Sequence, residues 1–159
     1  MQPHSVLPWS EVPAAALEGV RGVFTDIDDT LTRDGAIEPV ALNALQALHA
    51  AGLPVVAITG RPMGWSLPFA RAWPVAAIVA ENGAVAMYRQ GDGLVTEYVQ
   101  DDLTRRRNAL RLRAVAERVL REVPGATLAQ DSPGRVTDIA IDHSEFAHLD
   151  PNRIARSSR

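Results

Sequence analysis

The sequence contains no cysteine and no lysine, and all 16 of its basic residues are arginine. Without cysteine, the chain can form no disulfide, no thiolate metal site and no cysteine nucleophile. Without lysine, it can form no Schiff base and can supply neither a P-loop lysine nor any other catalytic ammonium group. These two absences exclude thiol chemistry and lysine-based catalysis.

A strong charge of one sign and long apolar runs are also absent. The formal net charge is −3, and this mildly acidic balance argues against nucleic acid as a partner. No run approaches the ~18 consecutive apolar residues of a membrane-spanning helix, and residues 1–9 carry no basic signal region. We therefore expect a cytoplasmic protein with no membrane partner.

Apolar strands alternate with helical segments in the first half of the chain. The expected strands cover 20–25, 53–58 and 75–80, and the expected helices between them cover 39–51 and about 66–73. Pro68 is tolerable only in the first turn of the second helix. Near-continuous apolar strands of this kind are typical of a parallel sheet that helices cover on both faces. The predicted fold class is α/β, with a Rossmann-like parallel sheet.

The pattern changes after Gly83 and predicts a second, α+β module. The elements expected there are a hairpin at 84–99, a long helix capped by Asp101 or Asp102, and short strands at 126–129 and 136–141. The expected organisation is an N-terminal arm (1–19), an α/β core with its hairpin (20–99), a partial α+β module (100–148) and a disordered tail (149–159).

Two carboxylates, Asp26 and Asp28, follow the first strand. Carboxylates so placed can bind a hard cation, in particular Mg²⁺, and one can attack a phosphoryl group while the other moves a proton. The plainer interpretation is that they cap a turn or the next helix. Polar residues at two further strand ends favour the chemical interpretation, because ligands bind at the carboxyl edge of open α/β sheets.

The ends of the second and third strands carry groups suited to an anion. Thr59 offers a hydroxyl and Gly60 a free backbone N–H, and both can hold a phosphoryl oxygen, with Arg61 beside them. Asn82 offers a donor and an acceptor toward whatever lies over the first strand. Each motif taken alone could be a simple turn or helix cap.

Together, these motifs resemble the haloacid dehalogenase-like (HAD) phosphatases, and in particular the subfamily IIB branch with its Cof-type sugar phosphatases. The segment from Asp26 to Thr32 resembles the first motif of the family. The segment from Val55 to Pro62 resembles the second motif, and Ala80-Glu81-Asn82-Gly83-Ala84 resembles a sequence that follows the third strand in that branch. The resemblance covers about residues 20–142.

The resemblance implies a set of roles at the matching positions. Asp26 would be the nucleophile that forms an aspartyl-phosphate, and Asp28 the general acid and base. Mg²⁺ would be held by the Asp26 carboxylate and the Asp28 backbone carbonyl. Thr59 and Gly60 would bind the phosphoryl group, and Asn82 would lie near the nucleophile. The module beginning near residue 100 would be the cap that selects the substrate.

The sequence also departs from the family pattern. The third motif of the family is a lysine or arginine and the fourth an acidic pair, and both follow the cap. We expect the chain to correspond to an N-terminal part of such a phosphatase. Asp138 and Asp142 are spaced like an acidic pair, but we interpret them as residues of a cap strand.

Three functions are compatible with these observations. The first is a Mg²⁺-dependent phosphatase that acts on a small phosphorylated metabolite, a sugar phosphate being the expected class. The second is a catalytically impaired HAD-like fragment that serves as a binding or interaction module. The third is a phospho-acceptor receiver domain, which the glutamate at position 81 and the missing lysine disfavour. Exposed sheet edges would favour pairing into a homo-oligomer.

Overall fold

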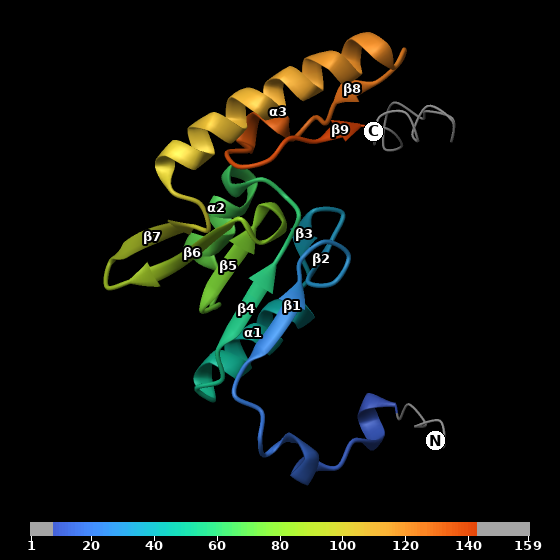
Figure 1. The fold of residues 1–159 in the computed structure, drawn as a ribbon. Helices are drawn as coiled ribbons and strands as arrows, with labels where there is room; N and C mark the ends of the chain where they lie inside the picture. The colour runs from blue at the N-terminus through green and yellow to red at the C-terminus, as the bar shows by residue number, and fades with distance from the viewer. Residues whose placement is uncertain (1–7, 143–159) are drawn as a thin grey trace, which may run out of the picture.

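The fold is built around a five-stranded sheet, seen in a computed structural model that describes residues 8–142 (Figure 1). In spatial order, the strands are β1 (Val23–Asp26), β4 (Val55–Ile58), β5 (Ala77–Ala80), β6 (Val85–Gln90) and β7 (Gly93–Tyr98). The first three are parallel, whereas β6 and β7 continue the sheet as an antiparallel hairpin. The predicted α/β class is confirmed, with a mixed sheet.

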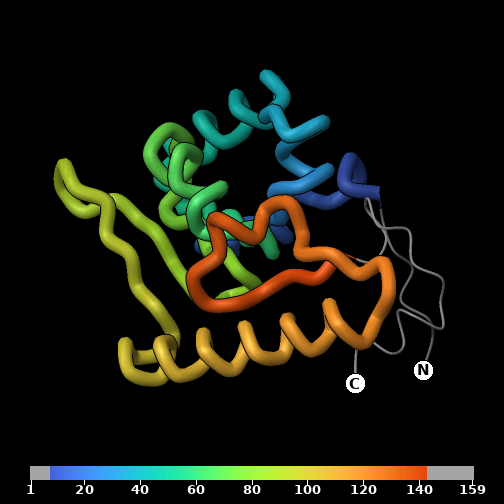
Figure 2. The backbone as a smooth tube through the Cα atoms, turned by 90° about the horizontal axis from the view of Figure 1, so that it is seen from above, coloured from blue at the N-terminus to red at the C-terminus, as the bar shows by residue number. Residues whose placement is uncertain are grey.

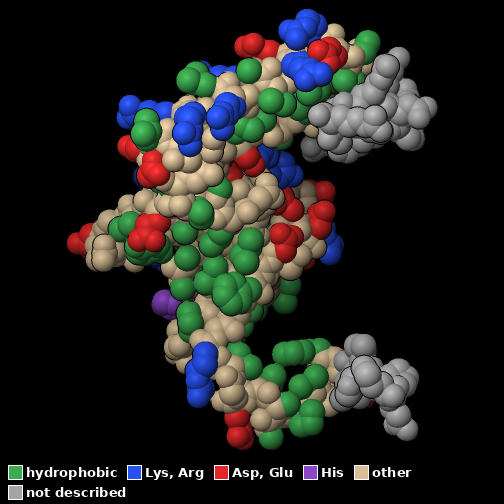
Figure 3. Space-filling view, in the orientation of Figure 1, with side chains coloured by type: hydrophobic (Ala, Val, Ile, Leu, Met, Phe, Trp, Pro, Cys, Tyr) green, Lys and Arg blue, Asp and Glu red, His purple; other side chains and the backbone are tan. Residues whose placement is uncertain are grey.

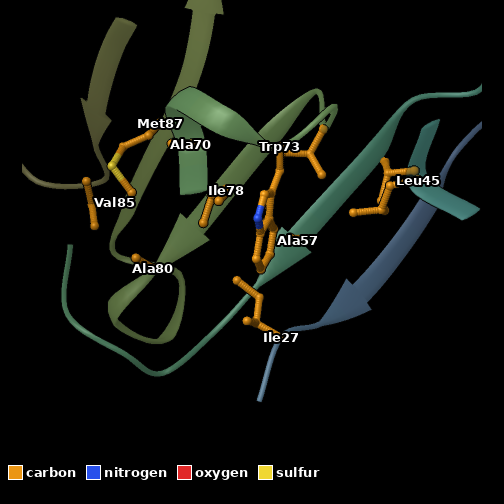
Figure 4. Close-up of a cluster of buried hydrophobic side chains, with 11 residues drawn as sticks. Ile27, Leu45, Ala57, Ala70, Trp73, Ile78, Ala80, Val85 and Met87 are labelled. Carbon is orange, nitrogen blue, oxygen red and sulfur yellow. The ribbon is translucent and has the colours of Figure 1, made fainter. Parts of the chain in front are cut away.

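Two helices pack on one face of this sheet. Helix α1 (Pro39–Ala50) begins at a proline whose fixed φ suits a first helical position. Helix α2 (Met63–Ala72) links β4 to β5. Buried side chains from three adjacent strands form a row beneath the helices, where Ala57 pairs with Ile78 and Ile78 with Met87 (Figure 4).

The prediction that helices cover both faces is wrong for the described residues. Phe24 and Ile58 alternate with the core-facing side chains and lie on the opposite face, where they are 75% and 37% exposed. Figure 3 shows hydrophobic side chains gathered on this face. The apolar strands led to the prediction, because strand sequence alone does not say which element covers each face.

Helix α2 begins three residues earlier than expected, and Pro68 lies in its second turn rather than its first. The sequence gives no capping residue at this end, because Pro62 precedes the first helical position and forms no side-chain cap. The amide of Met63 instead donates a 2.9 Å hydrogen bond to the Glu81 carboxylate. This cap comes from a distant part of the sequence, so local patterns could not reveal it.

The smaller elements flank the sheet. A short hairpin of β2 (Thr32–Arg33) and β3 (Ala36–Ile37) follows β1. The segment before β1 contains two 3-10 turns, η1 (Trp9–Glu11) and η2 (Ala14–Leu17), and lies away from the sheet (Figure 1). The first seven residues of the expected arm lie outside the described residues.

The second module consists of the long helix α3 (Asp102–Glu122), strands β8 (Thr127–Leu128) and β9 (Ile141–Asp142), and the 3-10 turn η4 (Ser132–Gly134). As predicted, Asp101 caps the helix, because its carboxylate accepts a 2.8 Å hydrogen bond from the Thr104 amide. The Arg105 guanidinium lies 3.7 Å from the Tyr98 ring centroid and joins α3 to β7. Figure 2 shows α3 running alongside the β8–β9 segment.

The expected strand at 136–141 is largely wrong, since only Ile141 and Asp142 pair with β8. The preceding residues form an irregular segment because the amides of Val136 and Thr137 donate to Glu81 instead of to a neighbouring strand. The expected tail, 149–159, lies outside the described residues. Among the helices of the described residues, none is long and apolar enough to cross a membrane.

Candidate active site

The ends of three parallel strands meet at one edge of the sheet. Asp26 at the end of β1 pairs with Ile58, and Ile58 pairs with Val79 of β5. The backbone continues this alignment, since the Thr59 amide donates to the Val79 carbonyl over 2.9 Å. The polar residues that the sequence places after separate strands are therefore neighbours in space.

Asp28, Thr59 and Arg61 form a hydrogen-bonded cluster at this edge. The Thr59 hydroxyl donates to Oδ2 of Asp28 over 3.0 Å, and Nε of Arg61 donates to Oδ1 of the same carboxylate over 3.0 Å. The Arg61 amide in turn donates to the Thr59 oxygen over 3.0 Å. Thr59 is only 2% exposed, so this network fixes its hydroxyl between the aspartate and the Arg61 backbone.

Asp26 differs from Asp28 in its surroundings. Its side chain is exposed at the end of β1, and among the described residues no hydrogen-bond donor or cation contacts the carboxylate. An exposed carboxylate without a partner is free to attack an electrophile or to bind a cation.

The residues at this edge suit a Mg²⁺ ion that is bound by only one or two protein groups. Mg²⁺ commonly keeps several waters and binds through one or two carboxylates together with substrate phosphate oxygens. The exposed Asp26 carboxylate is a metal ligand of this kind. In the described part of the chain, no cluster of three or more acidic, histidine or cysteine side chains is arranged to hold a metal.

Asn82 packs directly against Gly60. A Cβ atom on Gly60 would lie 3.0 Å from Oδ1 of Asn82, so any larger residue at position 60 would push the Asn82 side chain away. Asn82 has a left-handed backbone with φ of 57°, and so has Glu81 with φ of 50°. Consecutive left-handed residues other than glycine are uncommon, and such backbone conformations concentrate at functional sites.

The segment 131–138 also reaches this edge, although no sequence pattern predicts it. Arg135 donates to the carbonyl of Gly60 over 3.2 Å, and the Asn82 side-chain amide donates to Oδ2 of Asp138 over 3.2 Å. A guanidinium nitrogen of Arg61 lies 3.8 Å from an oxygen of Asp131. Asp138 is therefore a neighbour of the candidate site and not, as predicted, a residue of a strand.

Arg135 is the cationic residue of this segment, and its side chain is only 10% exposed. Its guanidinium bonds to Asp131 over 2.9 Å and to Asp138 over 2.8 Å. Burial lowers the pKa of Arg135, but the bonds to the two aspartates outweigh it and leave this pKa above its ordinary value. Arg135 is thus a positive charge held next to Gly60, just beyond the end of β4.

A cavity of about 840 Å³ lies between α3 and the segment 128–139. Arg105, Arg113 and Arg135 contribute positive charge to its wall, and Leu112 and Ile139 contribute apolar surface. Since Asp138 also lines it, the cavity adjoins the candidate site from the side of α3.

Glu81 is a residue whose role the sequence left undecided. Its carboxylate is 1% exposed and accepts hydrogen bonds from Met63, Val136 and Thr137. Burial raises the pKa of Glu81, but these hydrogen bonds outweigh it, so the pKa is below its ordinary value. The only sequence signal was an acidic residue directly after a buried strand.

The family follows from sequence comparison. Residues 23–107, more than half of the chain, match the family model described as haloacid dehalogenase-like hydrolase. The chain therefore belongs to the haloacid dehalogenase-like hydrolase family, as the resemblance of its motifs implied. Among curated protein sequences, none matches this chain at a significant level.

Solved structures agree on the fold. The chain is similar to Thermoplasma acidophilum 0175, with a TM-score of 0.62 and 17% identity over 87% of this chain and 55% of that one. It is also similar to a hypothetical protein from Geobacillus kaustophilus, with a TM-score of 0.50 and 19% identity over 87% of this chain and 49% of the other. The chain thus spans about half the length of these structures.

Proposed function

We propose that this chain provides the nucleophile-bearing part of a phosphatase that hydrolyses a small phosphorylated metabolite, with a sugar phosphate as the expected class. The observation that carries the proposal is that Asp26, whose carboxylate contacts no donor among the described residues, ends β1 at the same sheet edge as the Asp28–Thr59–Arg61 cluster. Membership of the hydrolase family supports the same reaction type.

In the proposed first step, an oxygen of Asp26 attacks the phosphorus of the substrate. A bond forms between Asp26 and phosphorus, the bond from phosphorus to the leaving oxygen breaks, and Asp28 gives its proton to that oxygen. In the second step, Asp28 takes a proton from water, and the resulting hydroxide attacks phosphorus and releases Asp26 and inorganic phosphate.

The surrounding residues suit these roles. Asp28 accepts two hydrogen bonds in this structure, which is the ionised form needed to take a proton from water in the second step. The protonated form needed in the first step would arise once the phosphoryl group takes Arg61 out of the ion pair. Arg61 supplies positive charge beside Asp28, and this charge can bind a phosphoryl oxygen when a substrate displaces the ion pair. Thr59 and the Gly60 amide would bind the transferred group, with Asn82 lying against Gly60.

Mg²⁺ is the cofactor that these groups fit. It would be held by the carboxylate of Asp26 and the backbone carbonyl of Asp28. Bound there, the ion would neutralise charge on the phosphoryl oxygens.

The test is hydrolysis of a panel of phosphorylated metabolites with Mg²⁺, together with acid-quench trapping of a phosphorylated chain from labelled substrate. Phosphate release and label on the chain, both lost in Asp26→Asn, are the expected results. Phosphate release that persists in Asp26→Asn would overturn the mechanism. Binding of phosphorylated ligands without release would instead favour a catalytically impaired binding module.

A further inference from the structure

The Glu81 carboxylate joins two segments that lie far apart in the sequence. One oxygen accepts from the amide of Met63, at the start of α2, over 2.9 Å. The carboxylate also accepts from the amides of Val136 and Thr137, over 3.0 and 2.7 Å, and from the Thr137 hydroxyl. Among the described residues, no cation pairs with Glu81, so these neutral donors alone solvate its buried charge.

We propose that Glu81 is a latch that holds the segment 131–138 against the core. Through this latch, Glu81 positions Arg135 and Asp138 beside the candidate active site. Glu81 acts through the segment and is a positioning residue. The latch itself does not depend on any reaction, whereas its effect on turnover rests on the proposed phosphatase function.

The backbone conformation of Glu81 supports a dedicated role. A φ of 50° is unfavourable for a residue with a long side chain, and the next residue, Asn82, is left-handed as well. Such a conformation persists where surrounding contacts determine it. Here it turns the carboxylate of Glu81 inward to meet the donors of Met63 and Thr137.

The packing of two glycines shows independently that the segment 131–138 fits closely against the core. We call the surface that it packs against, formed by Pro62 and Gly64, its seat. A Cβ atom on Gly64 would lie 3.1 Å from Cα of Gly134, and one on Gly134 would lie 3.1 Å from Cβ of Pro62. The segment therefore approaches the first turn of α2 more closely than side chains at these positions would allow. Neither glycine has a left-handed φ, so steric space rather than backbone freedom distinguishes them from alanine.

The latch determines where charged groups lie. Next to Thr137 along the chain, Asp138 accepts from Asn82, and two residues before Thr137, Arg135 donates to the Gly60 carbonyl. These two contacts are exposed, whereas Glu81 is buried. A hydrogen bond to a buried charge contributes more than an exposed one, so loss of Glu81 should free Arg135 and Asp138 together.

The experiment is amide hydrogen exchange on the full chain, resolved at Val136 and Thr137. The variants are Glu81→Gln, which keeps the shape but removes the charge, and Thr137→Val, which removes one donor and leaves the carboxylate. The matched control is Glu117→Gln, at an exposed position of α3. We expect exchange at both amides to become at least tenfold faster in Glu81→Gln, with no change in the control.

Trypsin provides a second readout, because it cleaves after arginine and Arg135 lies in the segment. Cleavage after Arg135 should become at least tenfold faster in Glu81→Gln and in Gly134→Ala, which disturbs the seat without touching the carboxylate. Exchange at the sheet residues Ala57 and Ile78 should stay unchanged. This localisation separates a latch from a general loss of stability.

Unchanged exchange at Val136 and Thr137 in a folded Glu81→Gln chain would overturn the proposal, as would equal acceleration in the segment and the sheet. If Glu81→Gln does not fold, Thr137→Val and Gly134→Ala decide the question by the same criteria. None of these measurements needs a substrate, so failure of the latch and failure of the phosphatase proposal are distinguishable. If turnover is detected, Glu81→Gln should raise KM more than it lowers kcat.

Discussion

The hydroxyl of Thr59 lies 3.0 Å from Oδ2 of Asp28, although 31 positions separate the two residues in the sequence. The contact exists because β1 and β4 are parallel neighbours that end at the same level of the sheet. It links the acid proposed to move protons to the group proposed to bind phosphate. Changes at either residue should therefore affect both stability and turnover.

Replacement of Thr59 by valine should show this double effect. The change removes a buried hydroxyl that both donates and accepts a hydrogen bond, at an expected cost of about 1–3 kcal/mol in the free energy of unfolding. Turnover should fall by about 100-fold, since a donor to the transferred group is lost. Chemical denaturation and steady-state kinetics measure the two effects.

Ser66→Ala is the matched control for Thr59→Val, because Ser66 also carries a buried hydroxyl, but one that donates to the carbonyl of Pro62, the residue before α2. It should lower stability while leaving turnover within about twofold. Equal loss of turnover in the two variants would show that Thr59 acts only through the fold.

Replacement of Asp26 by asparagine should abolish turnover and leave stability unchanged. The side chain is exposed, so its loss of charge costs little, but the proposed nucleophile disappears and kcat should fall by about 10³-fold or more. The thermal midpoint and kcat are the measurements. Asp34→Asn, in the exposed turn between β2 and β3, is the control and should keep full turnover.

Replacement of Gly60 by alanine should displace Asn82. The new Cβ would lie 3.0 Å from Oδ1 of Asn82, so the amide must shift, at a cost of about 1–3 kcal/mol in stability. Turnover should fall by about tenfold or more as the phosphate-binding turn is distorted. At Gly19 a Cβ meets nothing within 4 Å, so Gly19→Ala should change neither quantity. An unchanged Gly60→Ala protein would contradict the close packing.

The stability of the chain should depend on the ionisation of Glu81. Its pKa in the folded chain is below the ordinary value of 4.5, because hydrogen bonds from Thr137, Met63 and Val136 outweigh the effect of burial. The folded state therefore gains stability from Glu81 above about pH 4.5, and this gain is lost as the pH falls through the lowered folded pKa.

The free energy of unfolding of the wild type and Glu81→Gln, measured between about pH 3 and pH 7, checks this prediction. The advantage of the wild type should be largest near neutral pH and should shrink in acid. An advantage that stays constant over the range would show that ionisation of Glu81 does not contribute.

Much of the fold could be predicted because its signals are local. Pro39 and the glycine at position 52 mark the ends of α1, and Asp101 marks the start of α3. That Asp26, Thr59 and Asn82 lie at or just beyond the ends of neighbouring strands at one edge could also be predicted, because the carboxyl ends of parallel strands share an edge. The roles of these residues in catalysis stay predictions.

What could not be predicted depends on contacts between distant segments. The start of α2 at Met63 and the irregular backbone at Val136 have one cause, the carboxylate of Glu81. The apolar, β-branched segment at 136–141 has a strand pattern, but Glu81 takes its backbone donors. Asp138 was missed for the same reason, since a residue of a strand would not reach Asn82.

The five strands of the sheet lie in space in the order in which the chain presents them. Each new strand therefore pairs with the one completed just before it, and no strand has to be inserted between two others. A sheet of this kind can grow strand by strand while the chain leaves the ribosome, because each new strand finds its partner already formed. The segment 131–138 emerges after all five strands, so its seat on α2 and Glu81 is complete before it arrives.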